Sequence, residues 1–229
     1  MRKLLNYFSK GEIILWLFEI IFIVTFFCIF DRKEFLNLIS SLIGITALLF
    51  CAKGNPIGQA LVIVFSVLYG IISFGFAYYG EMLTYLGMTA PMAVISLVSW
   101  VKHPNGSNRS EVKISSLKRI DIIIMIPATI AVTIVFYFIL KAFGTANLFT
   151  STLSVTTSFS AAFLAFKRSP YYAAAYILND IVLIVLWSFA AIENISYLSV
   201  IICFVAFFIN DVYTFINWRK MQKRQLSKA

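Results

Sequence analysis

The chain contains the stretch Tyr171-Tyr-Ala-Ala-Ala-Tyr-Ile-Leu-Asn179-Asp180-Ile-Val-Leu-Ile-Val-Leu-Trp-Ser-Phe-Ala-Ala191, an apolar run with an amide and a carboxylate near its middle. A helix needs about 20 apolar residues to cross the roughly 30 Å hydrocarbon core of a bilayer, and this run is long enough. An ionisable side chain at that depth costs about 2.5–3.5 kcal/mol on insertion scales. A chain that keeps one there usually pairs it or uses it inside a helix bundle, so the stretch predicts a membrane helix that carries a functional site.

The composition extends this interpretation to the whole chain. Of its 229 residues, 61% are hydrophobic and only 13% are charged, and the mean hydropathy is +0.90. A soluble domain of this size has too little interior to bury so much apolar surface. The apolar runs are continuous, whereas the strands of a transmembrane β-barrel alternate apolar and polar residues. The sequence therefore predicts an all-α polytopic membrane protein.

Eight apolar runs are long enough to span a membrane as helices. The segments between them contain Gly, Pro, Asn or charged residues, which is typical of loops. Pro56 and Pro170 stand at helix starts, where a missing N–H costs little. Pro91 and Pro127 lie within runs and predict kinks. The expected helices cover residues 13–30, 35–52, 58–79, 82–101, 120–142, 147–166, 171–191 and 196–217.

The net charge of +9 is distributed over loops, which disfavours a nucleic-acid partner. With a cytoplasmic N-terminus, only Arg32, Lys33 and Lys141 of the 19 Lys and Arg residues fall on the outer side. This asymmetry is the positive-inside pattern of membrane proteins. It predicts an even number of spans, with both termini in the cytoplasm.

Cysteine and histidine give little sign of a metal site. Cys28, Cys51 and Cys203 form no Cys-x-x-Cys motif, and the only histidine, His103, lies in a loop. We therefore expect no disulfide, no metal site and no other cofactor. An intramembrane enzyme is disfavoured as well, because the spans contain no HExxH motif, no histidine and no cysteine beside a base.

Two stretches of the chain resemble each other at a separation of about 114 residues. Lys53-Gly-Asn-Pro56 corresponds to Lys167-Arg-Ser-Pro170, and Trp100-Val-Lys102 corresponds to Trp218-Arg-Lys220. Each stretch belongs to a unit of three helices. A directly duplicated three-helix unit comes out inverted, so the intervening helix at 120–142 restores the orientation. The pattern predicts a leading helix followed by 3+1+3 helices with parallel repeats, a transporter architecture whose site lies between the repeats.

This interpretation divides the chain into five segments, of which the two three-helix units are expected to enclose the site. The segments are a cytoplasmic N-terminus and leading helix (1–34), the first unit (35–101), a basic loop and connecting helix (102–146), the second unit (147–218) and a basic cytoplasmic tail (219–229).

One face of the 171–191 helix combines rings with polar groups. Tyr172, Tyr176 and Asn179 share this face with Trp187 at helical spacing. Rings for stacking and an amide for hydrogen bonding suit a flat heterocycle with a polar handle. The expected substrate-binding residues are Gln59, Tyr69, Tyr172, Tyr176, Asn179, Asp180, Trp187 and Asn210, and the expected gate or network residues are Asp211, Thr214 and Asn217.

Other polar and aromatic residues in the spans are interpreted as structural. The Ser- and Thr-rich helix at 147–166 is typical of close helix packing in membranes. Glu19 lies on the leading helix outside the repeats, and we expect it at a subunit contact or at the interface. Trp16, Trp100 and Trp218 stand at span ends and are interpreted as interfacial anchors.

Three segments resemble the corresponding helices of PnuC-type vitamin transporters, and the 3+1+3 layout matches over nearly the whole chain. They are Tyr79-Gly-Glu-Met82, Pro91-Met92 with Trp100-Val-Lys102, and Asn210-Asp-Val-Tyr-Thr-Phe-Ile-Asn-Trp-Arg-Lys220. The resemblance implies facilitated uptake of nicotinamide riboside or a related nucleoside or vitamin, trapped by a cytoplasmic nucleoside kinase. It also implies the bacterial cytoplasmic membrane, SWEET-like three-helix units and a homo-oligomer, by family precedent a trimer.

The chain departs from one motif of this family. The nicotinamide riboside carriers have Trp-x-x-Trp-x-x-x-Asn, which falls here on Tyr172, Ala175 and Asn179. The Asn is kept, but the first ring is smaller and the second is missing. A lost stacking surface is worth about 1–3 kcal/mol by analogy with base stacking. The substrate is therefore left open among nicotinamide riboside, deoxynucleosides and thiamine.

The main hypothesis is uniport by alternating access, with the two units moving about a central site. One alternative is the substrate-binding subunit of an energy-coupled vitamin importer, with the basic 102–119 loop as a docking segment. An intramembrane enzyme is the remaining alternative. Ion coupling through Asp180 is also left open.

Overall fold

A computed structural model describes residues 7–30, 32, 34–75, 78–106 and 108–227. Arg2, Lys3, Lys33 and Lys228, which the charge analysis assigns to sides of the membrane, lie outside the described residues. Within the described part, eight helices are long and apolar enough to cross a membrane. The predicted all-α polytopic membrane fold is confirmed.

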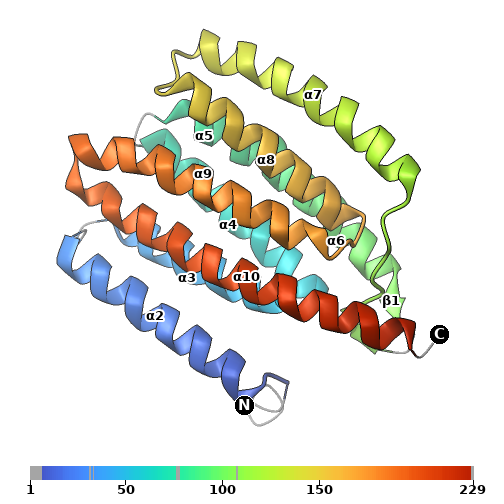
Figure 1. The fold of residues 1–229 in the computed structure, drawn as a ribbon. Coiled ribbons are helices and arrows are strands. Elements are labelled where there is room, and N and C mark those ends of the chain that lie inside the picture. Colours follow the sequence, from blue (N-terminus) through green and yellow to red (C-terminus); the bar gives the residue numbers. More distant parts are fainter. Residues whose placement is uncertain (1–6, 31, 33, 76–77, 107, 228–229) are drawn as a thin grey trace.

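The helices lie side by side in one bundle, with α2 at one edge and α7 at the other (Figure 1). Most ends lie within a few residues of the expected ones, but the last helix continues past residue 217 into its basic tail. The spans are α2 (Lys10–Phe30), α3 (Phe35–Ala52), α4 (Pro56–Gly75), α5–η1–α6 (Tyr79–Thr84, Tyr85–Thr89, Ala90–Lys102), α7 (Arg119–Ala142), α8 (Leu148–Phe166), α9 (Tyr171–Glu193) and α10 (Leu198–Leu226), which follows the 3-10 turn η2 (Ile195–Tyr197).

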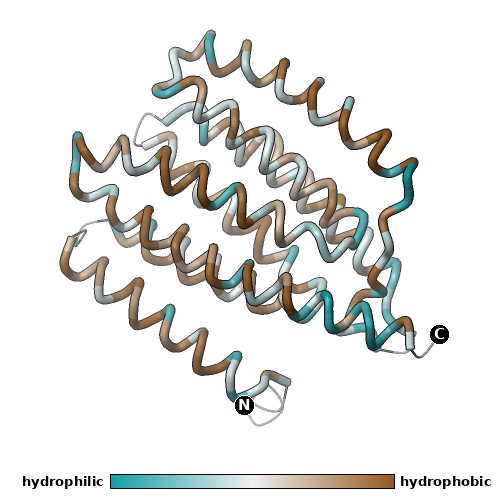
Figure 2. Tube along the Cα trace, viewed as in Figure 1, coloured by the Kyte–Doolittle hydropathy of each residue, from teal (hydrophilic) through white to brown (hydrophobic). Residues whose placement is uncertain are grey.

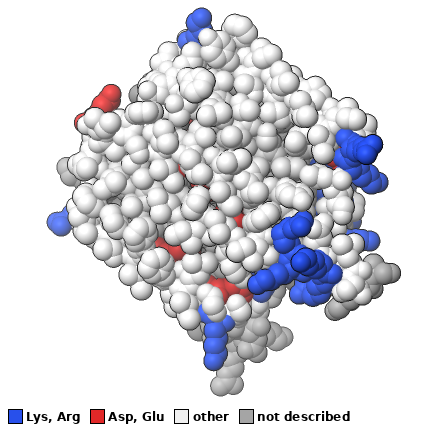
Figure 3. All heavy atoms as spheres, viewed as in Figure 1, with Lys and Arg blue, Asp and Glu red and all other residues white. Residues whose placement is uncertain are grey.

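Polarity is concentrated at the end of the bundle that bears both termini, hereafter the terminal end. The hydrophilic colour in Figure 2 gathers there, around the hairpin and the last turns of α10. Most Lys and Arg residues that Figure 3 shows lie near the same end. The outward faces of the spans carry exposed residues such as Ile14, Ile130 and Phe138, as a surface in contact with lipid requires.

The span at 79–102 is not the single kinked helix that we expected. It contains a π-helical turn, η1, in which the Ala90 N–H donates to the Tyr85 carbonyl five residues earlier. Pro91 explains this turn, because it has no N–H for the carbonyl four residues before it and its ring clashes there. Single π turns inside α-helices often mark functional sites. This one turns Tyr85 and Thr89 toward the centre of the bundle.

The first helix of each expected unit packs against the last helix of the other. In this way α3 contacts α10, and α8 contacts α6. The outermost helices follow the same arrangement, since α2 packs on α3 and α7 packs on α8. This packing leaves the second helices, α4 and α9, on either side of the centre.

The turns that lead into α4 and α9 have the same geometry. Gly54 and Arg168 both adopt a positive φ, of 65° and 56°. The Gly54 N–H donates to the Cys51 carbonyl at 2.9 Å, and the Arg168 N–H donates to the Ala165 carbonyl at 2.9 Å. The sequence correspondence between these two turns is therefore matched by their backbone hydrogen bonds.

Two tryptophans join the units reciprocally at the terminal end. The Trp100 Nε1–H donates to the Ala165 carbonyl at 2.9 Å, and the Trp218 Nε1–H donates to the Cys51 carbonyl at 2.8 Å. Both side chains are 0% exposed, and their rings lie 5.2 Å apart. The prediction that Trp100 and Trp218 are interfacial anchors is wrong, because both indoles are buried inside the bundle and donate to carbonyls of the opposite unit.

The residues that precede this tryptophan pair repeat the pattern. The Ser99 hydroxyl donates to the Phe166 carbonyl at 2.9 Å, and the Asn217 amide donates to the Ala52 carbonyl at 2.8 Å. Four hydrogen bonds thus connect the last helix of each unit to the end of the first helix of the other. Asn217, expected as a gate or network residue, here connects α10 to the end of α3.

The basic loop at 102–119 folds back onto the bundle. The Val112 N–H donates to the Gly54 carbonyl at 2.9 Å, and the Ser115 N–H donates to the Arg168 carbonyl at 3.0 Å. The loop therefore bridges the two equivalent turns. Its antiparallel hairpin consists of β1 (Pro104–Asn105) and β2 (Asn108–Val112).

Each outermost helix presents an acidic residue to the lysine of the neighbouring turn. Glu12 of α2 pairs with Lys53 at 3.2 Å, and Asp121 of α7 pairs with Lys167 at 2.7 Å. The helices α2 and α7 therefore occupy corresponding places. The leading helix is part of the bundle rather than an appendage.

Glu19 joins the leading helix to the second unit. Its side chain is 1% exposed, and both of its carboxylate oxygens lie 2.8 Å from the Asn210 Nδ2, which donates to them. The expectation that Glu19 lies at a subunit contact or at the interface is wrong. A carboxylate in the hydrocarbon region needs such a donor, because burial without one is costly.

We expect Asn210→Leu to destabilise the protein by about 1–3 kcal/mol, because it leaves the buried Glu19 carboxylate without its donor. Thermal unfolding in detergent measures the loss. The double variant Glu19→Leu/Asn210→Leu should recover much of it, since replacing both partners by apolar groups removes the desolvation penalty. An unchanged unfolding temperature for Asn210→Leu would contradict this role of the pair.

Candidate substrate-binding cavity between the two units

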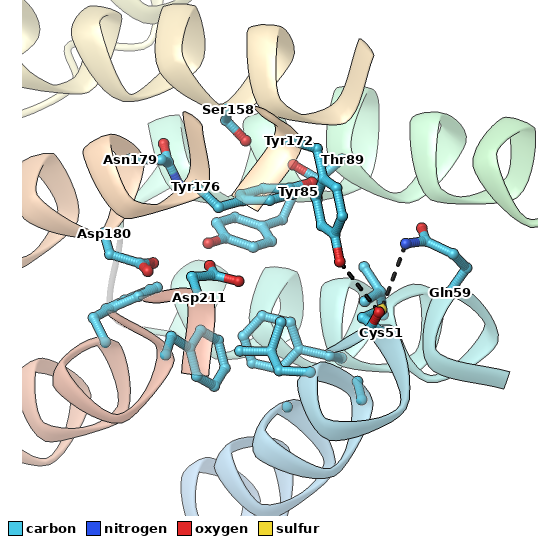
Figure 4. Close-up of a pocket in the computed structure, with 17 residues that line it drawn as sticks. Cys51, Gln59, Tyr85, Thr89, Ser158, Tyr172, Tyr176, Asn179, Asp180 and Asp211 are labelled. Atoms are coloured by element: carbon cyan, nitrogen blue, oxygen red, sulfur yellow. Dashed lines mark hydrogen bonds between the residues drawn. The ribbon is translucent and has the colours of Figure 1, made fainter. Parts of the chain in front are cut away.

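A cavity lies near the centre of the bundle, with α3, α4 and η1 on one side and α8, α9 and α10 on the other (Figure 4). The cavity has a volume of about 60 Å³. One water needs about 10–15 Å³, so this conformation has room for a few waters. A larger solute requires the walls to move apart. The lining residues with polar or aromatic side chains are Cys51, Gln59, Phe65, Tyr85, Thr89, Ser158, Tyr172, Tyr176, Asn179, Asp180, Phe204, Phe207 and Asp211.

The cavity brings together six of the eleven residues that the sequence singles out. They come from two units that are far apart in the chain. They are Gln59, Tyr172, Tyr176, Asn179, Asp180 and Asp211. The helical face at 171–191 thus points toward a cavity over its first half.

Two of the expected ring residues lie beyond the cavity, in an aromatic cluster toward the non-terminal end. Trp187 stacks on Tyr78 at 4.7 Å, and Tyr69 contacts Tyr85 at 4.4 Å. Phe204 contacts Tyr69 at 5.7 Å and also lines the cavity. The expected placement of Tyr69 and Trp187 in the substrate pocket therefore does not hold for this conformation. The cluster instead packs next to the cavity on this side, through Tyr85 and Phe204.

Two further expected site residues on α10 also lie away from the cavity walls. Asn210 donates to Glu19, as described above. Thr214 is fully buried, and its hydroxyl has no hydrogen-bond partner within the described residues. The direct ligand role expected for Asn210 is not supported by this placement. Its neighbour Asp211, expected as a gate or network residue, is the one that reaches the cavity.

The Asn179 side chain is oriented by a neighbouring hydroxyl. The Thr157 hydroxyl donates to the Asn179 Oδ1 at 2.8 Å. This bond uses one of the two lone pairs of the amide oxygen and fixes the Nδ2–H₂ group as the donor of the side chain. Asn179 is 4% exposed and suits a solute that presents an acceptor, such as a carboxamide oxygen or a hydroxyl.

Tyr172 closes the cavity toward the terminal end. Its ring packs on Trp218 at 4.8 Å and on Trp100 at 6.1 Å, and its hydroxyl donates to the Cys51 carbonyl at 3.3 Å. The Cys51 carbonyl therefore accepts from both Trp218 and Tyr172. The tryptophan pair and Tyr172 form one plug between the cavity and the terminal end.

The sequence reasoning missed several lining residues. Tyr85 and Thr89 enter the wall through the π turn, and Pro91 is the sequence signal from which that turn could be expected. Phe65 and Phe207 had no distinguishing signal among the 23 phenylalanines of the chain. Their rings contact each other at 5.2 Å in the cavity wall. Within the described residues, no group of His, Cys, Asp and Glu side chains is suited to hold a metal ion.

Known proteins resemble the chain in sequence and in fold. A family model described as nicotinamide mononucleotide transporter matches residues 34–220. The nicotinamide riboside transporter PnuC of Neisseria mucosa is 27% identical over 227 residues, covering 97% of this chain and 86% of that protein. The protein of the same name from Haemophilus influenzae is 23% identical over 192 residues, covering 83% and 82%. A crystal structure of the vitamin B3 transporter PnuC matches with a TM-score of 0.82 at 25% identity, covering 95% of this chain and 94% of that one.

We expect Trp218→Phe to make Cys51 react faster with a small thiol reagent, because the variant keeps an aromatic ring but loses the bond that holds the plug. With Cys28→Ser and Cys203→Ala in the background, Cys51 is the only thiol. A net hydrogen bond of about 1 kcal/mol corresponds to a several-fold rate increase.

The matched control is Trp16→Phe, which removes an indole bond to Thr46 in the outer part of the bundle. Trp100→Phe should act like Trp218→Phe, because the two bonds are reciprocal. Equal reactivity of Cys51 in all variants would show that the tryptophan pair does not close the cavity.

Proposed function

This chain belongs to the nicotinamide mononucleotide transporter family, and we propose that it carries nicotinamide riboside, or a nucleoside of similar size, across the bacterial cytoplasmic membrane. The observation that carries the proposal is the cavity between the two units, which Asn179, Gln59 and Tyr176 line. Amide groups and rings in one concave site are the elements from which small-molecule sites are built. The names of the relatives as transporters agree with this assignment.

The charge of the cavity favours a nucleoside over a phosphorylated nucleotide. None of the described residues that line it is Lys, Arg or His, whereas two of them, Asp180 and Asp211, are acidic. A phosphate group needs cationic or N–H donors to replace its water. Two carboxyl groups repel it instead. We therefore assign the unphosphorylated riboside as substrate, although the family model bears the name of the mononucleotide.

The lining residues suggest how a nucleoside is held. Tyr176 and the Phe65–Phe207 pair offer ring faces for a flat base. The Asn179 amide N–H₂ donates to a carboxamide oxygen or a ribose hydroxyl, and the Gln59 amide contributes further hydrogen bonds. The side chain at Ala175 offers no ring, and Tyr172 is engaged with the tryptophan pair. The site therefore depends on Tyr176 for stacking more than the family motif does.

Alternating access is the mechanism that we propose. The units 35–101 and 147–218 are related by the matched turns and by the reciprocal hydrogen bonds of Trp100 and Trp218. In this conformation the tryptophan plug lies between the cavity and the terminal end, and the aromatic cluster lies beyond the other side of the cavity. Movement of one unit against the other opens the cavity to one side at a time, as in other transporters with repeated units.

The proposal also covers the orientation of the protein in the membrane, the accumulation of its substrate and its oligomeric state. Both termini face the cytoplasm, because the Lys and Arg residues gather at the terminal end (Figure 3). Transport is uniport, so accumulation depends on a cytoplasmic nucleoside kinase that traps the substrate. The protein works as a homo-oligomer, with a trimer as the form taken from the family.

Uptake of labelled nicotinamide riboside into liposomes that contain only the purified chain tests the proposal. We expect saturable uptake that stops at equal concentrations inside and outside, without ATP and without an ion gradient. Uphill uptake driven by a proton or sodium gradient would contradict uniport. Absence of uptake by folded protein would contradict the substrate assignment.

In this assay Asn179→Ala should abolish saturable uptake, and Thr157→Val should raise KM about three- to tenfold, because the hydroxyl that orients Asn179 is lost. The matched control is Thr156→Val, which removes a similar hydroxyl that bonds Thr133 instead. If Thr157→Val and Thr156→Val behaved alike, the orientation of the Asn179 amide would not determine binding.

A further inference from the structure

Two acidic side chains of neighbouring helices meet in the cavity wall. Asp180 of α9 is 3% exposed and Asp211 of α10 is 2% exposed, and both line the cavity. Their carboxyl groups interact directly and lie close together in Figure 4. The Oδ2 of Asp180 and the Oδ1 of Asp211 have no hydrogen-bond partner within the described residues.

Two other buried acidic groups have cationic or amide partners, whereas Glu81 accepts from the Ser154 hydroxyl and keeps an unpartnered Oε2 outside the cavity wall. Glu12 accepts from Lys53 and from the Tyr213 hydroxyl, and Glu19 accepts from Asn210 through both oxygens. These carboxylates hold helices together, and their partners are side chains of the protein. Among the described residues the Asp180–Asp211 pair has no such cationic or amide partner, and both residues line the cavity.

A structural role does not account for this pair. Helix packing in a membrane needs small or singly polar residues, whereas two adjacent carboxyl groups at this depth raise the cost of burial. The cost is offset when a positive charge comes to lie beside both. The surrounding rings add to the same preference, because aromatic faces attract cations.

We propose that Asp180 and Asp211 determine the charge selectivity of the cavity. They favour flat nucleosides whose base carries a fixed positive charge, such as an N-ribosylated pyridinium. This inference rests on the proposed function and specifies its substrate class. Purine and pyrimidine nucleosides are neutral and gain nothing from the pair. Asn179, the neighbour of Asp180 in the chain, then forms a hydrogen bond with the polar substituent of the ring, and the two carboxyl groups lie beside the positive charge of the ring.

Two ligands that differ in charge test the proposal directly. Nicotinamide riboside carries the pyridinium charge, and its 1,4-dihydro form keeps the ribose and the carboxamide but is neutral. Equilibrium binding to the purified full chain is measured for the wild type and for Asp180→Asn, Asp211→Asn and the double variant. Asparagine preserves the shape of each side chain, and thermal unfolding checks that the variants are folded.

The wild type should bind the cation about tenfold or more tightly than the neutral form, which is a difference of about 1.4 kcal/mol. Each single variant should weaken binding of the cation and leave binding of the neutral form nearly unchanged, and the double variant should bind the two ligands equally. Glu193→Gln, which changes an exposed acidic residue at the far end of α9, is the matched control and should leave both affinities unchanged.

The outcomes separate the two proposals. If the wild type binds both ligands with equal affinity, or if the Asp variants weaken binding of both ligands equally, the cavity binds nucleosides but the pair does not determine charge selectivity. If folded wild type binds neither ligand, the substrate assignment is wrong, and the charge selectivity that rests on it is wrong as well.

Discussion

The fold depends on a single constraint: the hydrocarbon core supplies no hydrogen-bond partner, so a buried polar group is costly unless it finds one within the bundle or faces a cavity. At the terminal end, carbonyls in the last turns of α3 and α8 accept hydrogen bonds from side chains of the opposite unit. Trp218 and Asn217 donate to Cys51 and Ala52, and Trp100 and Ser99 act in the same way on α8. The ends of two helices are thereby fixed against each other, and the cavity lies directly beyond them.

The correspondence between the two halves extends to the outermost helices. Glu12 on α2 and Asp121 on α7 pair with lysines at equivalent positions, Lys53 and Lys167. The leading helix, Lys10–Phe30, lies outside the residues that the family model matches, which begin at 34, yet it is connected to α10 through Glu19 and Asn210. The bundle therefore includes a buried carboxylate on a helix that precedes the matched region.

Much of the architecture could be predicted from the sequence, because apolar runs and loop charges are direct consequences of the membrane environment. Helical spacing also singled out Tyr172, Tyr176 and Asn179, and the cost of a charge in mid-span singled out Asp180; all four line the cavity. The same spacing misplaced Trp187, since one helical face runs past the cavity into the aromatic cluster.

The remaining errors have physical causes that the sequence does not display. Tyr85 and Thr89 reach the cavity through a π turn, which shifts the helical register. The roles of Trp100, Trp218 and Glu19 depend on which helices become neighbours. Polar residues in a span show that partners exist, but only the packing shows which residues the partners are.

The central claim is that a nucleoside occupies the cavity between the units, with its polar group at Asn179 and its base beside Tyr176 and Asp211. The most direct measurement is a structure of the protein determined in the presence of nicotinamide riboside. The account predicts ligand density at that position, with the carboxamide or ribose within hydrogen-bond distance of the Asn179 Nδ2. Ligand density elsewhere, or an Asn179 side chain that faces lipid with no cavity beside it, would contradict the account.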